Sequence, residues 1–206
     1  MKLKLSILLT AFLAGNLLAQ SIDLPAPQKT GGMPLMEALA KRSTARAFAT
    51  NDLSPQQISS LLWSAFGINR PDGKRTAPSA SNKQETDIYV LLKSGAYVYS
   101  AVSNKLDLVG TNDIRALGGT QEFVKDAPVT LVFVADLAKR GGNNEAARNA
   151  ANIDVGYISQ NVYLFCASEG LVTGARGSVD RAALGQKLKL RPDQLIVLAQ
   201  SVGFPK

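Results

Sequence analysis

Residues 88–99 read Ile88-Tyr89-Val90-Leu91-Leu92-Lys93-Ser94-Gly95-Ala96-Tyr97-Val98-Tyr99. Two runs rich in β-branched and aromatic residues flank the turn Lys93-Ser94-Gly95, a pattern that predicts a β-hairpin. A hairpin pairs its strands antiparallel, whereas a parallel βαβ unit needs a helix between its strands. These residues therefore favour an α+β fold over a repeating α/β fold.

Helices are indicated on both sides of this hairpin. Ser54 and Gln57 have the spacing of a capping box, Pro55 takes the first helical position, and apolar residues follow with helical spacing up to Phe66. Periodicity predicts further helices at 35–42, 121–125, 143–169 and 181–188, and strands at 129–135 and 195–201. We expect the long helix to have an apolar side that contains Ile153, Tyr157, Leu164, Cys166 and Ala167.

The chain has 206 residues, no histidine and one cysteine, and these counts exclude several kinds of active site. Without histidine there is no Ser-His-Asp triad and no Cys-His pair, and a single thiol cannot complete a zinc site of the usual ligands. A carboxylate or carbonyl site for Mg²⁺ or Ca²⁺ stays open on composition alone. The reactive group of an enzyme would be a carboxylate, lysine, tyrosine, serine or bound cofactor. Cys166 is expected to pack inertly in a helix face.

The first 19 residues have the layout of a secretory signal peptide. Lys2 and Lys4 precede an apolar run that starts at Leu5, and we expect cleavage after Ala19. The run is shorter than the roughly 20 apolar residues of a spanning helix, and a membrane anchor is the alternative to a cleaved signal. We predict an exported, periplasmic protein with no stable membrane span, a flexible lead-in at residues 20–33 and one domain at residues 34–206.

The positive charge of the chain is mild once the signal is considered. Loss of residues 1–19 removes two lysines and no acidic residue, which lowers the formal net charge from +7 to +5. The sequence has no block of five or six like charges, so nucleic acid is not an expected partner. Scattered basic residues suit a small anion better.

Three polar patches each have a functional and an ordinary structural explanation. Residues 42–46, Arg-Ser-Thr-Ala-Arg, offer two guanidinium groups and two hydroxyls to phosphate oxygens, or form a solvated turn. In residues 75–84, small residues would let the backbone approach a ligand closely, and Asn82 and Gln84 would offer it hydrogen-bond donors and acceptors. The alternative is a surface loop without a binding role. Residues 170–178 are predicted to form a turn after the long helix, in which glycines either expose backbone amides to a ligand or simply end the helix.

In combination the patches resemble one family, the flavin-dependent nitroreductase-like proteins. Residues 42–48 resemble the family's Arg-x-Ser-x-Arg-x-Phe signature, and residues 78–84 are similar to its Pro-Ser-x-x-Asn-x-Gln loop. Further matches follow in the family's order: Ala127-Pro128, Asp154-x-Gly156 with Gln160-Asn161, Gly170-Leu171 and Val202-Gly203-Phe204-Pro205. The resemblance spans residues 34–205. Leu61-Leu62-Trp63 with Gly67 is most similar to the branch that includes azoline-forming dehydrogenases.

The resemblance implies a three-layer sandwich, in which helices flank a central, mostly antiparallel sheet and the long helix lies at a homodimer interface. It also implies FMN, bound between the two chains, and no metal. The phosphate and ribityl chain would be held by Arg42, Thr44 and Arg46, with Ser43 beside them. The partner subunit would contribute its own copies of Pro78, Ser79, Ala80 and Asn82. Gln121 is the candidate for the pyrimidine edge, and backbone amides of Arg176, Gly177 and Ser178 would face flavin N5.

The activity implied is hydride transfer between a donor and a small, flat organic acceptor by a ping-pong flavin mechanism, with no catalytic side chain. The best-known members use NAD(P)H, which is not freely available outside the cytoplasm, so the donor of an exported member is open. Two other functions fit the same residues. One is an exported protein that binds flavin or another planar ligand without turnover, and the other is an envelope interaction protein on a degenerate flavin fold.

Overall fold

The computed structural model describes residues 21–206, so the predicted signal peptide and its cleavage point lie outside the described residues. Four α-helices are present in this part of the chain: α1 (Leu35–Lys41), α2 (Pro55–Phe66), α3 (Glu145–Ser168) and α4 (Arg181–Lys187). The strands are β1 (Ile22–Asp23), β2 (Thr86–Leu92), β3 (Gly95–Ser100), β4 (Lys105–Gly110), β5 (Val129–Asp136), β6 (Val172–Arg176) and β7 (Gln194–Gly203).

These strands form one seven-stranded sheet in the order β1-β4-β3-β2-β5-β7-β6, and every neighbouring pair is antiparallel. The predicted hairpin is confirmed as β2 and β3, in which Tyr89 lies opposite Val98. Strand β5 is buried along its whole length, as its continuous apolar run predicts. The α+β fold class is therefore confirmed.

Three strands lie where the sequence patterns indicate none, and the first of them, β1, belongs to the predicted lead-in. Strand β4 occupies a segment with no assigned element, although buried Leu106 alternates with polar neighbours. Strand β6 lies within residues 170–178, so the interpretation of that whole segment as a turn is wrong for residues 172–176. Gly174 lies within the strand and lowers its β propensity, and β6 lies at the sheet edge, where pairing with β7 rather than local propensity fixes its conformation.

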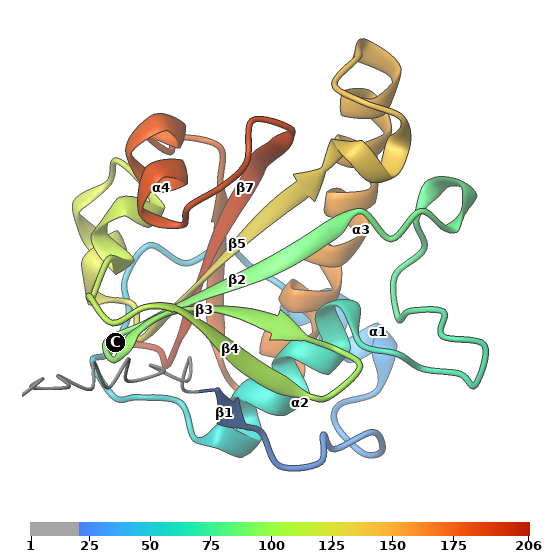
Figure 1. The fold of residues 1–206 in the computed structure, drawn as a ribbon. Helices are drawn as coiled ribbons and strands as arrows, with labels where there is room; N and C mark the ends of the chain where they lie inside the picture. The colour runs from blue at the N-terminus through green and yellow to red at the C-terminus, as the bar shows by residue number, and fades with distance from the viewer. Residues whose placement is uncertain (1–20) are drawn as a thin grey trace, which may run out of the picture.

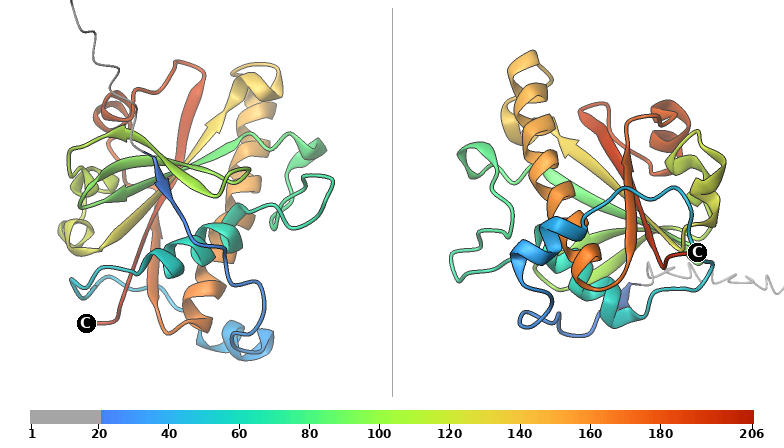
Figure 2. Two further views of the ribbon diagram at one scale, coloured as in Figure 1. Left: turned by 60° about the horizontal axis from the view of Figure 1, so that its bottom comes forward. Right: turned by 180° about the vertical axis from the view of Figure 1, so that it is seen from behind.

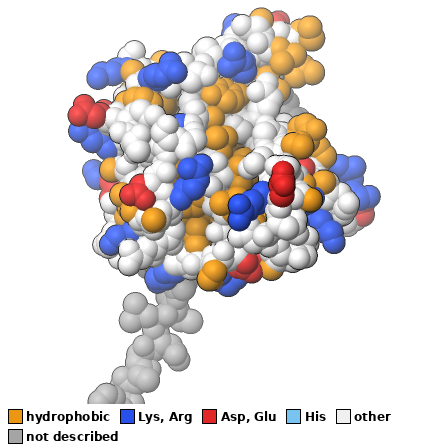
Figure 3. All heavy atoms as spheres, turned by 90° about the horizontal axis from the view of Figure 1, so that it is seen from above, with side chains coloured by type: hydrophobic (Ala, Val, Ile, Leu, Met, Phe, Trp, Pro, Cys, Tyr) orange, Lys and Arg blue, Asp and Glu red, His pale blue; other side chains and the backbone are white. Residues whose placement is uncertain are grey.

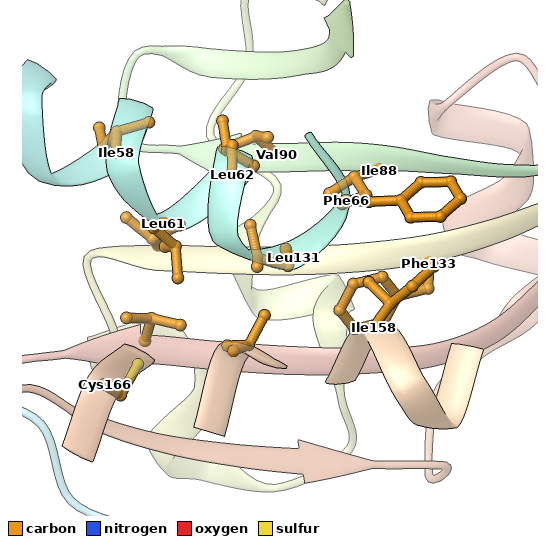
Figure 4. Packing of buried hydrophobic residues seen from close by; sticks show 14 of the residues in the cluster. Ile58, Leu61, Leu62, Phe66, Ile88, Val90, Leu131, Phe133, Ile158 and Cys166 are labelled. Atoms are coloured by element: carbon orange, nitrogen blue, oxygen red, sulfur yellow. The ribbon is translucent and has the colours of Figure 1, made fainter. Parts of the chain in front are cut away.

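Helices cover both faces of the sheet, which makes a three-layer sandwich (Figures 1 and 2). On one face α2 and α3 pack against β2 and β5, where Leu61 and Ile158 lie in the same buried cluster as Leu131 (Figure 4). On the other face, Leu184 of α4 and Leu188, which directly follows this helix, belong to a second buried cluster. The layered architecture implied by the resemblance is confirmed, while the homodimer interface stays a prediction.

Helix α2 begins as its sequence predicts. The Ser54 hydroxyl accepts the Gln57 N–H at 3.2 Å, and the Gln57 side chain accepts the Ser54 N–H at 2.9 Å. This reciprocal cap satisfies two backbone donors that a helix otherwise leaves unpaired. The cap fixes the start of α2, and the long loop that precedes β2 follows the other end of the helix (Figure 1).

The buried side of α3 differs from the predicted one. Ile153 and Tyr157, predicted on the apolar side of the helix, are 58% and 49% exposed, so this side of α3 is not part of the core of the described chain. The core instead takes Asp154, Ile158 and other residues on the same face, and a helix turns about 100° between neighbours such as 153 and 154. Cys166 is buried as predicted. Burial raises the pKa of its thiol, which makes it a poor nucleophile.

Residues 21–33, predicted as a flexible lead-in, make defined contacts with the domain. Ile22 of β1 lies opposite Leu106 of β4, and the Met33 N–H donates to the Ser168 hydroxyl at 2.7 Å. Short β pairing and side-chain hydrogen bonds are not visible in the Pro- and Gly-rich composition of this segment. The described part of the lead-in therefore extends the domain by one edge strand.

Candidate functional site

The basic segment that follows α1, residues 42–46, lies beside the edge strand β6. The Ala45 N–H donates to the Thr173 carbonyl at 2.8 Å. Gly174 permits this approach, because a Cβ atom at that position would lie 2.5 Å from the Ala45 oxygen. Ser43, Thr44 and Arg46 are exposed and Arg42 is half-buried. The segment thus presents its donors along one edge of the sheet.

Tyr163 on α3 connects the basic segment to β6. Its hydroxyl lies 3.0 Å from Thr44 Oγ1 and accepts the Ala175 N–H at 3.0 Å. The Arg42 guanidinium lies over its ring, 5.4 Å from the centroid, within cation–π distance. Because the phenolic oxygen already accepts from Ala175, its O–H can donate to Thr44, which leaves the Thr44 proton available to a ligand.

Arg176 ends β6 with a buried side chain. Its guanidinium donates to the carbonyls of Gly118 and Gly174, at 2.9 and 3.2 Å, and lies 5.6 Å from the centroid of the Phe123 ring. Burial lowers the pKa of Arg176 to about 10, so the group stays cationic at neutral pH. These bonds draw residues 118–121 to the end of β6 and place a buried positive charge there.

Gln121 lies in this same region and carries an unpaired buried acceptor. Its Oε1 atom has no hydrogen-bond partner among the described residues, and a Cβ atom at Gly119 would lie 3.0 Å from it. The Thr120 N–H donates to the Ser178 carbonyl at 3.0 Å, which brings residues 120–121 next to the predicted Arg176–Ser178 turn. An unpaired buried acceptor costs about 1–3 kcal/mol, and an N–H of a bound ligand would remove that cost.

These four features form one cluster, which we call the basic site: residues 42–46, Tyr163, Gln121 and residues 176–178. Strand β6 holds them together, since the basic segment lies beside its middle and the Gln121 segment lies at its end. Of the predicted site residues, the structure thus gathers Arg42, Ser43, Thr44, Arg46, Gln121, Arg176, Gly177 and Ser178 around a single strand.

The amide loop, residues 78–84, lies elsewhere on the same chain. It projects from the body of the molecule between α2 and β2 (Figures 1 and 2). Ala80 contacts α3 at Asp154, nine residues before Tyr163 and therefore about 13 Å away along the helix. Within residues 21–206 no hydrogen bond or ion pair joins the amide loop to the basic site. One chain therefore carries two separate groups of predicted site residues.

The surface and composition of the described part of the chain add three observations. Lys and Arg side chains are scattered over the face seen in Figure 3, with apolar side chains between them. Residues 21–206 contain no group of three or more His, Cys, Asp or Glu side chains that could hold a metal ion. No helix within these residues has the length and apolar character needed to cross a bilayer.

Sequence patterns did not single out Tyr163, and they named Asp154 only within the Asp154-x-Gly156 match, without the role that the structure gives it. Tyr163 stands in an apolar helical stretch, and only its hydroxyl distinguishes it from a core aromatic residue. Asp154 is a charged residue on the buried side of α3, with 2% of its surface exposed. A lone acid on an apolar helical face is the signal that could have identified it, because such groups are rarely buried without partners.

The sequence profile of the nitroreductase family matches residues 39–204, and the chain belongs to this family. Its class is therefore that of an oxidoreductase. A proposed nitroreductase from Methanocaldococcus jannaschii is 25% identical over 175 residues, which cover 80% of this chain and 88% of that protein.

Two solved structures have the same fold. The crystal structure of a proposed nitroreductase from Ralstonia eutropha is 38% identical to this chain, with a TM-score of 0.86 and coverage of 90% of each chain. The NADPH:FMN oxidoreductase from Vibrio harveyi, solved in complex with NAD+, is 18% identical, with a TM-score of 0.64. That match covers 84% of this chain and 69% of the other, and at this identity it shows a common fold alone.

Proposed function

We propose that this protein is an FMN-dependent oxidoreductase that transfers a hydride from a donor to a small, flat organic acceptor. The observation that carries the proposal is the pairing, around β6, of an exposed basic segment with the unpaired buried acceptor Gln121 Oε1. A ligand with an anionic group at one end and a ring N–H at the other suits this pairing. The name of the Vibrio harveyi neighbour supports FMN as that ligand.

The phosphate group suits the basic segment. A phosphate monoester carries nearly two negative charges at neutral pH, and a guanidinium group can donate two parallel hydrogen bonds to its oxygens. Arg42 and Arg46 would supply this charge, while Ser43 and Thr44 add hydroxyl donors. Tyr163 holds Thr44 and Arg42 in place, so part of the conformational entropy of binding is already lost in the free protein.

The ring system suits the opposite end of the basic site. Gln121 Oε1 would accept the N–H of the pyrimidine edge, and the buried charge of Arg176 favours electron density in the ring. Backbone amides of Arg176, Gly177 and Ser178 would face N5. When bound, FMN supplies reversible two-electron chemistry, in which it takes a hydride from the donor and passes it to the acceptor in a ping-pong scheme. The chain needs no histidine for this chemistry.

The amide loop completes the site from a second subunit in this proposal. The loop that carries Pro78, Ser79, Ala80 and Asn82 reaches α3 about 13 Å along the helix from Tyr163, and no hydrogen bond among residues 21–206 joins it to the basic site of its own chain. Exposed Ile153 and Tyr157 on α3 offer an apolar surface that a homodimer would bury. A dimer with two-fold symmetry would form two equivalent sites, each from one basic site and one partner loop.

We also propose that the protein acts outside the cytoplasm, because residues 1–19 have the features of a secretory signal. NAD(P)H is the donor suggested by the names of relatives, but an exported enzyme needs a donor that is present in its own compartment. A quinol or another small exported reductant meets that requirement. The acceptor would be a planar organic molecule that stacks on the ring.

The test is an anaerobic titration of the purified protein with FMN, followed by reduction and reoxidation. We expect a yellow complex that bleaches with a two-electron reductant and recovers its absorbance when a quinone or nitroaromatic compound is added. A complex that bleaches but recovers with neither acceptor would favour flavin binding without turnover. A colourless protein that leaves the fluorescence of added FMN unchanged would contradict the proposal, and would favour an interaction protein.

A further inference from the structure

Two buried carboxyl groups and a partly buried guanidinium meet where the amide loop joins the body of the molecule. Arg140 Nη1 lies 3.2 Å from Glu85 Oε1 and 3.5 Å from Asp154 Oδ2. Glu85 and Asp154 are 0% and 2% exposed, and the three residues come from three different segments. We call this group the loop anchor. None of its members belongs to the basic site.

The loop anchor holds both polar atoms of one residue in the amide loop. The Ala80 N–H donates to Asp154 Oδ2 at 2.9 Å, and the Ala80 carbonyl accepts from Arg140 Nη1 at 3.3 Å. Lys139, next in sequence to Arg140, donates to the Gln84 carbonyl at 3.5 Å and pairs with Asp87. Hydrogen bonds thus hold the amide loop to the rest of the domain near both of its ends. Asp154 and Arg140 bind Ala80, and Lys139 binds Gln84.

The backbone of the amide loop needs such support. Ser81, Asn82 and Gln84 have φ angles of 54°, 51° and 48°, in the left-handed region that non-glycine residues rarely occupy. Each such residue costs of the order of 1 kcal/mol and persists only where surrounding contacts impose it. Within the loop, the Gln84 side chain donates to Asn82 Oδ1 at 3.0 Å and to the Gly73 carbonyl at 3.2 Å.

Stability alone is a poor explanation for the loop anchor. Burying charged groups carries a desolvation penalty that their mutual attraction often fails to recover. Glu85 has neither carboxyl oxygen in a well-aligned hydrogen bond among the described residues, and burial raises the pKa of this carboxyl. A cluster that stabilises little but holds one loop residue by both its polar atoms acts on loop geometry.

From this geometry we infer that Asp154, Arg140 and Glu85 are positioning residues. They fix the amide loop, before any ligand binds, in the conformation that delivers Ala80 and Asn82 to the flavin site of the partner subunit. The inference rests on the proposed function in one respect, the choice of FMN as the ligand. Its first measurement, the amide exchange of the loop in the FMN-free protein, does not depend on that function. Loop order in the protein without FMN depends on the anchor alone.

The experiment compares wild type with Asp154→Asn, which keeps the shape of the side chain and removes its charge. In the FMN-free protein we expect the amide hydrogens of residues 80–84 to exchange at least about tenfold faster in the variant, because a charge-assisted hydrogen bond to Ala80 is replaced at best by a weaker neutral one. Exchange in β5 should not change. FMN binding, followed by fluorescence quenching, should weaken by about tenfold or more.

The matched control is Ser159→Ala, which removes a different buried hydrogen bond of the same helix, from the Ser159 hydroxyl to Gln200 at 2.8 Å. This control should lose as much thermal stability as Asp154→Asn but keep the amide exchange of the loop and the FMN affinity of wild type. That result would show that the loop anchor positions the amide loop, and that its effect on FMN does not come from a general loss of stability. A second variant, Arg140→Lys, keeps the positive charge of the loop anchor. It should bind FMN less tightly than wild type but more tightly than Asp154→Asn.

Unchanged exchange of residues 80–84 in Asp154→Asn would overturn the inference, whatever FMN does. Faster loop exchange with unchanged FMN affinity would also overturn it, because the loop would then not serve the flavin. If wild type itself ignores FMN, the proposed function fails. Loop exchange then still decides whether the anchor orders the loop.

Discussion

At the residue scale, the basic site depends on a side chain that no motif points to. The sequence signature identifies Arg42, Thr44 and Arg46 because guanidinium and hydroxyl groups at that spacing suit phosphate. It does not reveal Tyr163, because a tyrosine in an apolar helix usually packs in the core. Only the fold brings its hydroxyl to Thr44 and Ala175.

Replacing Tyr163 by phenylalanine should therefore weaken FMN binding about fivefold, the effect of losing a hydrogen bond worth about 1 kcal/mol. The Ala175 N–H loses its acceptor, and Thr44 loses the donor that orients its proton. Fluorescence titration with FMN measures the change. Tyr157→Phe is the control, because Tyr157 lies on the same helix and is 49% exposed. Equal dissociation constants for Tyr163→Phe and wild type would exclude an orienting role.

A comparison of two ligands can distinguish a contact between Arg46 and the FMN phosphate from a general loss of structure in the variant. We expect Arg46→Ala to weaken FMN binding by about tenfold or more, since a charge-assisted hydrogen bond to phosphate is lost. Riboflavin, which lacks the phosphate, should bind wild type and variant equally. Parallel calorimetric titrations with the two ligands test this. A similar loss for both ligands would mean that Arg46 does not contact the phosphate.

At the scale of elements, the sequence predicts what local pattern controls and fails where pairing controls. The capped helix α2, the β2–β3 hairpin and the buried strand β5 all follow from spacing and capping residues. Strand β6 contains Gly174 and lies at an edge, so its neighbours rather than its own propensity define it. The position of the basic segment is consequently a tertiary property.

Gly174→Ala tests this element directly. A Cβ atom would lie 2.5 Å from the Ala45 oxygen, so the basic segment must move away from β6, at a cost of about 1–3 kcal/mol in unfolding free energy. FMN affinity should fall as well. Gly110→Ala is the control, because Gly110 also lies in a strand and a Cβ there meets nothing within 4 Å. Chemical denaturation that finds both variants equally stable would contradict the close approach.

Glu85, which directly precedes β2, should make the stability of the fold depend on pH. Burial raises the pKa of Glu85 in the folded protein above its ordinary value, so the folded state keeps this proton after the unfolded state has released it. The contribution to unfolding free energy is full below the ordinary carboxyl pKa and is lost as pH rises toward the folded pKa. Relative to Glu85→Gln, wild type should lose stability from pH 4 to pH 7. A constant difference between their denaturation midpoints would contradict the shift.

At the scale of the whole molecule, the fold places the basic site and the amide loop apart on one chain. Order along the sequence cannot show this separation, because the residues of the basic site are spread from 42 to 178 and both groups contact α3. Ile153 and Tyr157 were expected on an apolar side of α3 and are exposed, which the proposed dimer would explain. The central claim is that two chains share each flavin site.

The most direct test of this claim is to measure FMN binding in a mixture of two variants, each of which has lost one part of the site. Arg42→Ala/Arg46→Ala removes the charges of the basic site. Asn82→Gly removes a side chain of the amide loop and suits its φ of 51°. Each variant alone should bind FMN poorly. After random subunit exchange, half of the dimers combine both variants and contain one intact site, so about a quarter of all sites should bind FMN with wild-type affinity. A mixture that binds no better than its components would show that each site belongs to a single chain.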